Sequence, residues 1–151
     1  MKMLKQYKFG FDLLGVVIFL LVMLPTFIWL AFPAPNDVLR TESVTPVVDT
    51  VATICQALFV ACMCLLVNKE RSQRRFSPLI IVSVVCVAVY YIGWVLYYCG
   101  NAASWVILML TLPPCAVFIL FTLERKNLPA TLFAVVFAVC HTVFAIMNFI
   151  Q

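Results

Sequence analysis

Five long apolar runs follow one another along this chain, separated only by short polar connections. They cover residues 9–32, 47–67, 77–99, 105–123 and 129–150. A helix needs about 20 apolar residues to cross about 30 Å of hydrocarbon, and each run has that length. With 66% hydrophobic and 11% charged residues, the chain has too few charged side chains to coat a soluble domain. We therefore expect an all-α, polytopic integral membrane protein whose single domain is a bundle of five transmembrane helices.

Prolines inside the apolar runs predict where the helices are distorted. Pro25 lies in the first run, and Pro113 and Pro114 lie near the middle of the fourth. Because proline has no N–H, each one removes a backbone hydrogen bond. We expect a kink at Pro25 and a stronger disruption at the proline pair. The fourth run is therefore the only candidate for a segment that re-enters the membrane, and broken helices can free carbonyl groups for a ligand.

The positions of the basic residues predict the orientation of the bundle. Of the 10 Lys and Arg residues, all but Arg40 lie before the first run, between the second and third, or between the fourth and fifth. The positive-inside rule therefore places the N-terminus in the cytoplasm and the C-terminus outside. Basic loops beside anionic headgroups need only the lipid bilayer as a partner, so we expect no nucleic-acid binding.

The length of the first run argues against a cleaved secretory signal. The apolar part of a signal peptide has about 7–15 residues, and this run is longer. It ends in Phe32-Pro33-Ala34-Pro35, which is not a cleavage pattern. We interpret it as a retained span. The short loops and the lack of a soluble domain favour a multi-pass protein of a prokaryotic plasma membrane.

Sulfur-containing residues predict neither a disulfide framework nor a metal site. Six of the seven cysteines lie inside apolar runs, where we interpret them as small packing residues. Cys62-Met63-Cys64 offers the soft ligands that Cu(I) prefers. Residues two apart on a helix point about 200° from each other, so both thiols cannot hold one ion. We expect no metal and no cofactor.

Motifs for an enzyme are few. The sequence contains no HExxH, no GxSxG and no phosphate-binding glycine loop. Asp37, Arg40, Glu42 and Asp49 lie towards the outer side, where acid–base chemistry would be possible. We interpret them as part of a mobile outer loop, so catalysis is the less favoured function.

A polar stripe in the second run is the first candidate binding site. Asp49, Thr53 and Gln56 are spaced i, i+4 and i+7 and share one helical face. Polar side chains are costly in hydrocarbon, so such residues are candidates for function. The stripe could be the wall of a cavity open to the outside. Alternatively, Asp49 lies at the water interface near a helix N-terminus and Gln56 bonds a neighbouring helix.

The fifth run could complete the same lining. His141, the only histidine, lies near its middle, and Asn148 follows two turns later on the same face. A neutral imidazole can relay protons or contact a ligand. The alternative is a hydrogen bond between helices.

Aromatic residues of the third run form a further candidate. Tyr90, Trp94 and Tyr97 share one face, and Tyr98 lies on an adjoining face. We expect Tyr97 and Tyr98 to belong to an interfacial aromatic belt. The deeper pair, Tyr90 and Trp94, could bind a flat or cationic ligand.

Two functions remain open at this point. The first is a small membrane protein that binds or transports a small solute through an outward-facing polar cavity, as a homo-oligomer or as a subunit of a larger complex. The second is a non-catalytic accessory, assembly or immunity-type protein that packs against another membrane protein. They differ in whether Gln56 and His141 meet a ligand or hold helices together.

Overall fold

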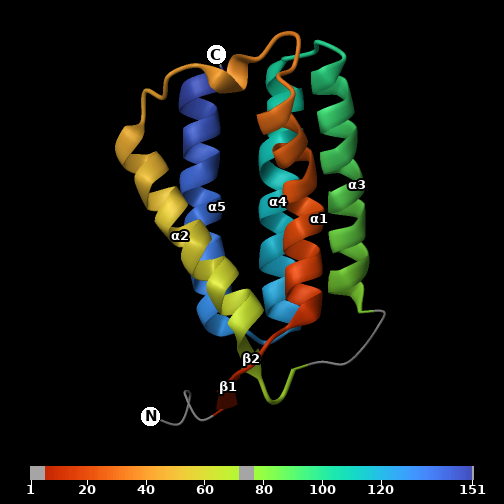
Figure 1. The fold of residues 1–151 in the computed structure, drawn as a ribbon, viewed down its shortest axis with the longest axis vertical. Helices are drawn as coiled ribbons and strands as arrows, with labels where there is room; N and C mark the ends of the chain where they lie inside the picture. The colour runs from red at the N-terminus through yellow and green to blue at the C-terminus, as the bar shows by residue number, and fades with distance from the viewer. Residues whose placement is uncertain (1–5, 72–76, 151) are drawn as a thin grey trace.

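The computed structural model describes residues 6–71 and 77–150, and five long helices lie side by side in it (Figure 1). They are α1 (Leu13–Ala31), α2 (Pro46–Leu65), α3 (Pro78–Tyr98), α4 (Ser104–Glu124) and α5 (Leu128–Phe149). Consecutive helices run in opposite directions (Figure 1). Each is long and apolar enough to cross a membrane, so an all-helical bundle of five such helices is confirmed.

The two ends of the bundle differ in their chemistry. One end holds the short strands β1 (Tyr7–Phe9) and β2 (Leu66–Asn68) and the turn between α4 and α5 (Figure 1). We call it the basic end, because Arg71 and Arg125 lie there. The opposite end carries the segment 32–45 with a short 3-10 helix, η2 (Val38–Arg40), and we call it the loop end.

The strand pair shortens the first two helices relative to the predicted spans. β1 and β2 pair antiparallel, with Phe9 opposite Leu66. The pairing continues through backbone bonds from Gly10 N to Leu65 O (3.0 Å) and from Asp12 N to Cys64 O (2.8 Å). Helix α1 therefore begins at residue 13 instead of 9, and α2 ends at residue 65 instead of 67, because these backbone groups bond each other instead of extending the helices.

Polar residues fix where several helices begin. The side chains of Asp12, Ser77 and Asn127 accept hydrogen bonds from backbone N–H groups in the first turns of α1, α3 and α5. Such caps satisfy donors that have no partner within the helix. Thr45 directly precedes α2, but its hydroxyl makes no capping bond.

Helix α4 continues through its two prolines. Pro113 and Pro114 both lie inside the continuous helix, so the fourth run does not turn back at the proline pair. Helix α3 packs closely against α4 near this point, since a Cβ added to Gly93 would lie 2.9 Å from the Cβ of Met109. That contact supports α4 where proline removes the backbone bond to the Met109 carbonyl.

The helices pack as two pairs with α1 against them. α3 packs along α4, α2 packs along α5, and α4 and α5 join the two pairs. α1 makes fewer contacts with its neighbours. It approaches α2 most closely at the basic end, where a Cβ on Gly15 would lie 2.9 Å from the Met63 carbonyl oxygen. Towards the loop end, α1 and α2 diverge (Figure 1).

Candidate functional site

A cavity of about 360 Å³ lies inside the bundle, in the half nearer the loop end. All five helices and the loop contribute to its wall. The lining residues are Val22, Met23, Thr26, Trp29, Leu39, Gln56, Tyr90, Trp94, Leu110, Thr111, Pro114, Cys115, Phe118, Phe137, His141, Phe144, Ala145 and Phe149. Its volume is in the lower part of the range that holds small organic ligands.

Aromatic rings form much of this wall. The ring centroid of Trp94 lies 6.3 Å from that of Trp29 and 6.3 Å from that of Tyr90. On α5, the imidazole of His141 stacks on Phe137, with ring centroids 5.0 Å apart and planes 16° apart, and lies nearly parallel to Phe144 at 6.3 Å. Flat rings in these orientations leave faces and edges that suit a planar ligand.

Three polar groups from α1 and α3 lie at the cavity wall. The hydroxyls of Thr26 and Tyr90 are 3.2 Å apart and form one hydrogen bond. The indole of Trp94 is buried, with 7% of its surface exposed. Among the described residues its Nε1 makes no hydrogen bond of ordinary distance and angle, and the Tyr90 side chain is the polar group with which it interacts. A buried donor without a well-formed hydrogen bond costs free energy, so this N–H has the capacity to bind a ligand atom.

The polar groups that α2 and α5 contribute to the wall also have few hydrogen-bond partners. The Gln56 amide nitrogen contacts the Met23 sulfur at 3.9 Å, which is a weak bond to a thioether. For the His141 ring, the described residues provide stacking contacts and the electrostatic influence of Asp49, but no hydrogen bond. None of the described lining residues carries a formal charge, if His141 is neutral.

The structure brings four of the seven predicted site residues together. Gln56, Tyr90, Trp94 and His141 all line the cavity. The other three, Asp49, Thr53 and Asn148, lie outside it. The wall is therefore mainly aromatic and apolar, with isolated polar groups, instead of the continuous polar lining that the spacing predicted.

Asn148 and its neighbours join helix ends. The Asn148 carboxamide accepts a hydrogen bond from Val44 N at 2.7 Å and donates one to the Thr45 hydroxyl at 2.9 Å. The Thr45 hydroxyl lies 3.4 Å from the Asp49 carboxylate. Thr53 is exposed on α2 and donates to the Asp49 carbonyl at 2.8 Å. These contacts fix the start of α2 against the end of α5.

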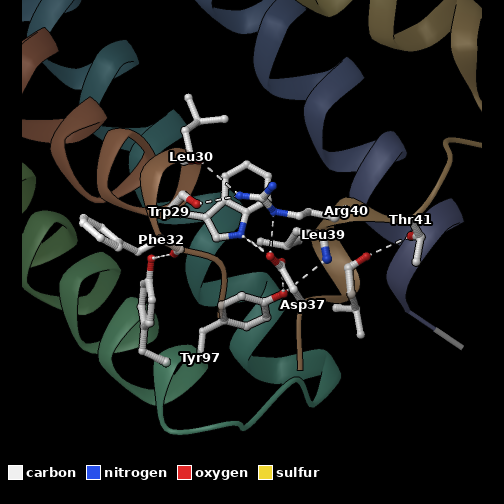
Figure 2. A network of polar contacts seen from close by, with 10 residues as sticks. Trp29, Leu30, Phe32, Asp37, Leu39, Arg40, Thr41 and Tyr97 are labelled. Atoms are coloured by element: carbon white, nitrogen blue, oxygen red, sulfur yellow. Dashed lines mark hydrogen bonds and ion pairs between the residues drawn. The ribbon is translucent and has the colours of Figure 1, made fainter. Parts of the chain in front are cut away.

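A carboxylate in the loop anchors the end of the cavity (Figure 2). Asp37 accepts hydrogen bonds from Trp29 Nε1 at 2.8 and 3.0 Å, from the Tyr97 hydroxyl at 3.0 Å and from Arg40 Nε at 2.8 Å. The Tyr97 hydroxyl in turn accepts from Leu39 N at 3.2 Å. Because Leu39 lines the cavity, this network holds a part of the cavity wall in place.

Arg40 attaches the same loop to the end of α1. Its Nη2 donates to the Trp29 carbonyl at 2.9 Å, and its guanidinium lies 5.0 Å from the centroid of the Trp29 ring. From the sequence we expect Asp37 and Arg40 in a mobile outer loop, but in the structure both bond Trp29 of α1. The spacing of three residues between Asp37 and Arg40 could have predicted their ion pair. No sequence pattern indicated their contacts with α1 and α3.

A second cluster closes the basic end of the bundle. The Asp12 carboxylate, of which 7% is exposed, accepts from Arg125 Nη2 at 2.7 Å and from Arg71 Nη1 at 3.1 Å. It also caps α1. Asp12 therefore connects the start of α1 to the segments that follow α2 and α4.

Comparison of the chain with protein-family models, with curated proteins and with solved structures finds no match. Within residues 6–71 and 77–150, no group of three or more His, Cys, Asp and Glu residues could hold a metal ion. The cavity and the two anchored ends of the bundle are therefore the features on which a function can be based.

Proposed function

We propose that the protein is a membrane-embedded binding protein for a small, neutral, planar molecule held in the cavity between the five helices. The observation that carries this proposal is the 360 Å³ cavity itself, which combines stacked aromatic walls with polar groups that have few or no partners. Ligand sites of membrane and soluble proteins share this combination of an apolar wall and a few directed polar groups.

The contacts of Gln56 and His141 support a ligand site over a purely structural role. If these residues held helices together, each would form a hydrogen bond to another helix. Gln56 does bond another helix, α1, but only weakly, through the Met23 thioether at 3.9 Å, and the described contacts of His141 include no hydrogen bond. A ligand in the cavity would give both side chains a polar partner.

We also propose the orientation that the basic residues indicate. The basic end faces the cytoplasm and the loop end faces outwards, in a plasma membrane. Asp12, Arg71 and Arg125 then lie at the cytoplasmic surface, where their ion pairs meet water and headgroups. Transport would require this end to open, so binding is the function that this arrangement supports.

Fluorescence of the cavity tryptophans provides the test. The chain has three tryptophans, and Trp105→Phe removes the exposed one, leaving Trp29 and Trp94 in the cavity wall. The probe is 1,4-naphthoquinone, which quenches tryptophan fluorescence, added to the protein in lipid nanodiscs. We expect saturable quenching with one site per chain.

A matched pair of variants on α5 shows whether the cavity is the site. Ala145→Phe fills part of the cavity, since Ala145 is 2% exposed and lies in its wall. Val139→Phe introduces the same side chain at a position that is 60% exposed. We expect the first change to weaken binding about tenfold or more, as blocking a pocket does, and the second to have no effect. Quenching that does not saturate, or that is equal in both variants, would instead favour the accessory-protein alternative.

A further inference from the structure

The cavity has an open side, and the exposure of its wall shows where that side lies. Every lining residue contributed by α3 and α4 is buried. The partly exposed lining residues come from α1, α2, α5 and the loop: Met23, Thr26, Trp29, Leu39, Gln56, His141, Phe144 and Phe149. The closed wall is thus formed by the α3–α4 pair, and the opening lies on the side of α1, α2 and α5.

Specific contacts border this opening at both ends. At the basic end, α1 and α2 touch at Gly15 and Met63 and are bonded through Asp12 N and Cys64 O. At the loop end, Leu39 covers the cavity and is held by the Tyr97 hydroxyl. Between these ends α1 and α2 diverge (Figure 1), and the contact of 3.9 Å between Gln56 and Met23 spans the gap.

The α1 side of the rim is apolar. On α1, Leu20 and Phe27 lie one turn to either side of Met23, on the same helical face, and they are 51% and 45% exposed. These residues lie in the middle and outer part of a helix that is long enough to cross a membrane. In a bilayer, such a rim faces lipid chains and not water.

The wall chemistry restricts the ligand. The Trp94 N–H can only donate and makes no hydrogen bond of ordinary geometry, and the Tyr90 hydroxyl with which it interacts already bonds Thr26, so an acceptor on the ligand would complete it. The described wall carries no formal charge with a neutral His141, and a charged ligand would not be compensated there. The tryptophan, tyrosine and imidazole rings favour a flat molecule. These features together describe a neutral planar ring that carries a carbonyl oxygen.

We infer that the ligand is a lipid-soluble carbonyl compound of the quinone class, whose ring binds in the cavity and whose apolar tail leaves through the opening between α1 and α2. This inference rests on the proposed function and specifies its ligand and its route. The ligand reaches the site from the bilayer, not from the aqueous phase at the loop end.

A reversible cross-link across the opening tests the route. In a cysteine-free background, Met23→Cys and Gln56→Cys are joined by a short, reducible bis-thiosulfonate, and the probe is a benzoquinone with a decyl tail. The reference is the same protein after reduction. Cross-linking before addition of the probe should slow the rate of tryptophan quenching about tenfold or more, because the opening between α1 and α2 is blocked. Cross-linking after loading should retain the probe on dilution.

A second cross-link tests the opposite route. Val44→Cys and Asn148→Cys join the loop to α5 at the loop end, where the Val44 N–H bonds Asn148. We expect this cross-link to leave the binding rate unchanged. If it blocks binding while the link between positions 23 and 56 does not, the ligand enters from water and the inferred route is wrong.

The ligand class has its own test. Trp94→Phe retains a ring but removes the N–H, so it should weaken binding of the quinone about fivefold more than it weakens binding of 2-methylnaphthalene, which has no acceptor. Calorimetry in nanodiscs measures both. Equal affinities of the two probes, with no effect of Trp94→Phe, would overturn the quinone assignment while leaving a binding cavity. If neither probe binds the parent protein, the proposed function itself fails.

Discussion

The indole N–H of Trp29 donates to both carboxylate oxygens of Asp37, at 2.8 and 3.0 Å. This contact connects a residue of α1 with a residue of the loop eight positions later. Asp37 also binds Tyr97 of α3, so one carboxylate holds the loop to two helices (Figure 2). The loop end of the cavity is therefore closed by specific polar contacts and not only by chain connectivity.

Replacing Asp37 should destabilise the protein markedly. Asp37→Ala leaves the Trp29 indole and the Tyr97 hydroxyl without their acceptor in a site where the carboxylate is only 12% exposed. We expect the free energy of unfolding to fall by about 2–4 kcal/mol. Denaturation in mixed micelles, followed by circular dichroism, measures it. Glu42→Ala, which alters a nearby exposed carboxylate, is the control and should change stability by less than about 0.5 kcal/mol.

The helices could be predicted from the sequence because hydrophobicity and length are local properties. Each of the five runs became one membrane-length helix. The strand pair of residues 7–9 and 66–68 could not be predicted, because three residues carry little pattern and the pairing joins distant parts of the chain. The same applies to the loop network, whose donors lie on two other helices.

The two ion pairs that Asp12 makes should differ in coupling energy. Arg125 is 16% exposed and lies 2.7 Å from Asp12, whereas Arg71 is 34% exposed and lies 3.1 Å away. Water screens the more exposed pair more strongly. Double-mutant cycles with Asp12→Asn and either Arg125→Met or Arg71→Met should give about 2 kcal/mol for the first pair and less than about 1 kcal/mol for the second. A larger coupling to Arg71 would contradict this assignment.

Glycine at position 15 should be required for the contact between α1 and α2. In Gly15→Ala the added Cβ would lie 2.9 Å from the Met63 carbonyl oxygen, and a backbone atom cannot easily move away. We expect a loss of about 1–3 kcal/mol. In Gly10→Ala the Cβ would meet Val67 Cγ2 at an ordinary 3.5 Å, so this matched variant should be close to neutral. Similar unfolding midpoints for the two variants would show that the close approach is not needed.

The orientation of the bundle can be measured with topology reporters. A reporter fused after Lys126, in the turn between α4 and α5, should show that this turn lies in the cytoplasm. A reporter fused after Asn101, in the turn between α3 and α4, should report the outside, because the positive-inside rule assigns these turns to opposite faces. The reverse pattern would invert the proposed topology without changing the bundle.

The candidate site was predictable only in part, for a geometric reason. Helical spacing correctly relates residues on one helix, but it does not show which face turns towards the bundle axis. Gln56 and His141 reach the cavity, whereas Thr53, on the same run as Gln56, is exposed. The cavity depends on how far α1 and α2 diverge, and that angle is set by contacts such as Gly15 with Met63 that no local pattern contains.

Two adjacent tyrosines provide a final comparison. Tyr97 and Tyr98 were both expected in an interfacial belt, yet Tyr97 is fully buried, with 0% exposed. Its hydroxyl donates to Asp37 and accepts from Leu39 N, whereas the Tyr98 hydroxyl donates to the exposed Phe32 carbonyl at 2.7 Å. Tyr97→Phe leaves a buried carboxylate and a backbone N–H each short of one partner, so it should cost about 1–3 kcal/mol.

Tyr98→Phe should cost less than about 1 kcal/mol, because water can bond the carbonyl that it releases. The two variants remove the same atom from neighbouring positions, so differences in hydrophobicity and helix propensity cancel. Unfolding in mixed micelles measures the stability of each, and hydrogen exchange of the Leu39 amide reports the loop directly. We expect that exchange to accelerate in Tyr97→Phe alone, since the hydroxyl that accepts from this amide is lost only there. Equal acceleration in both variants would mean that the loop is held by its attachment to α1, through Trp29 and Arg40, and not by Tyr97.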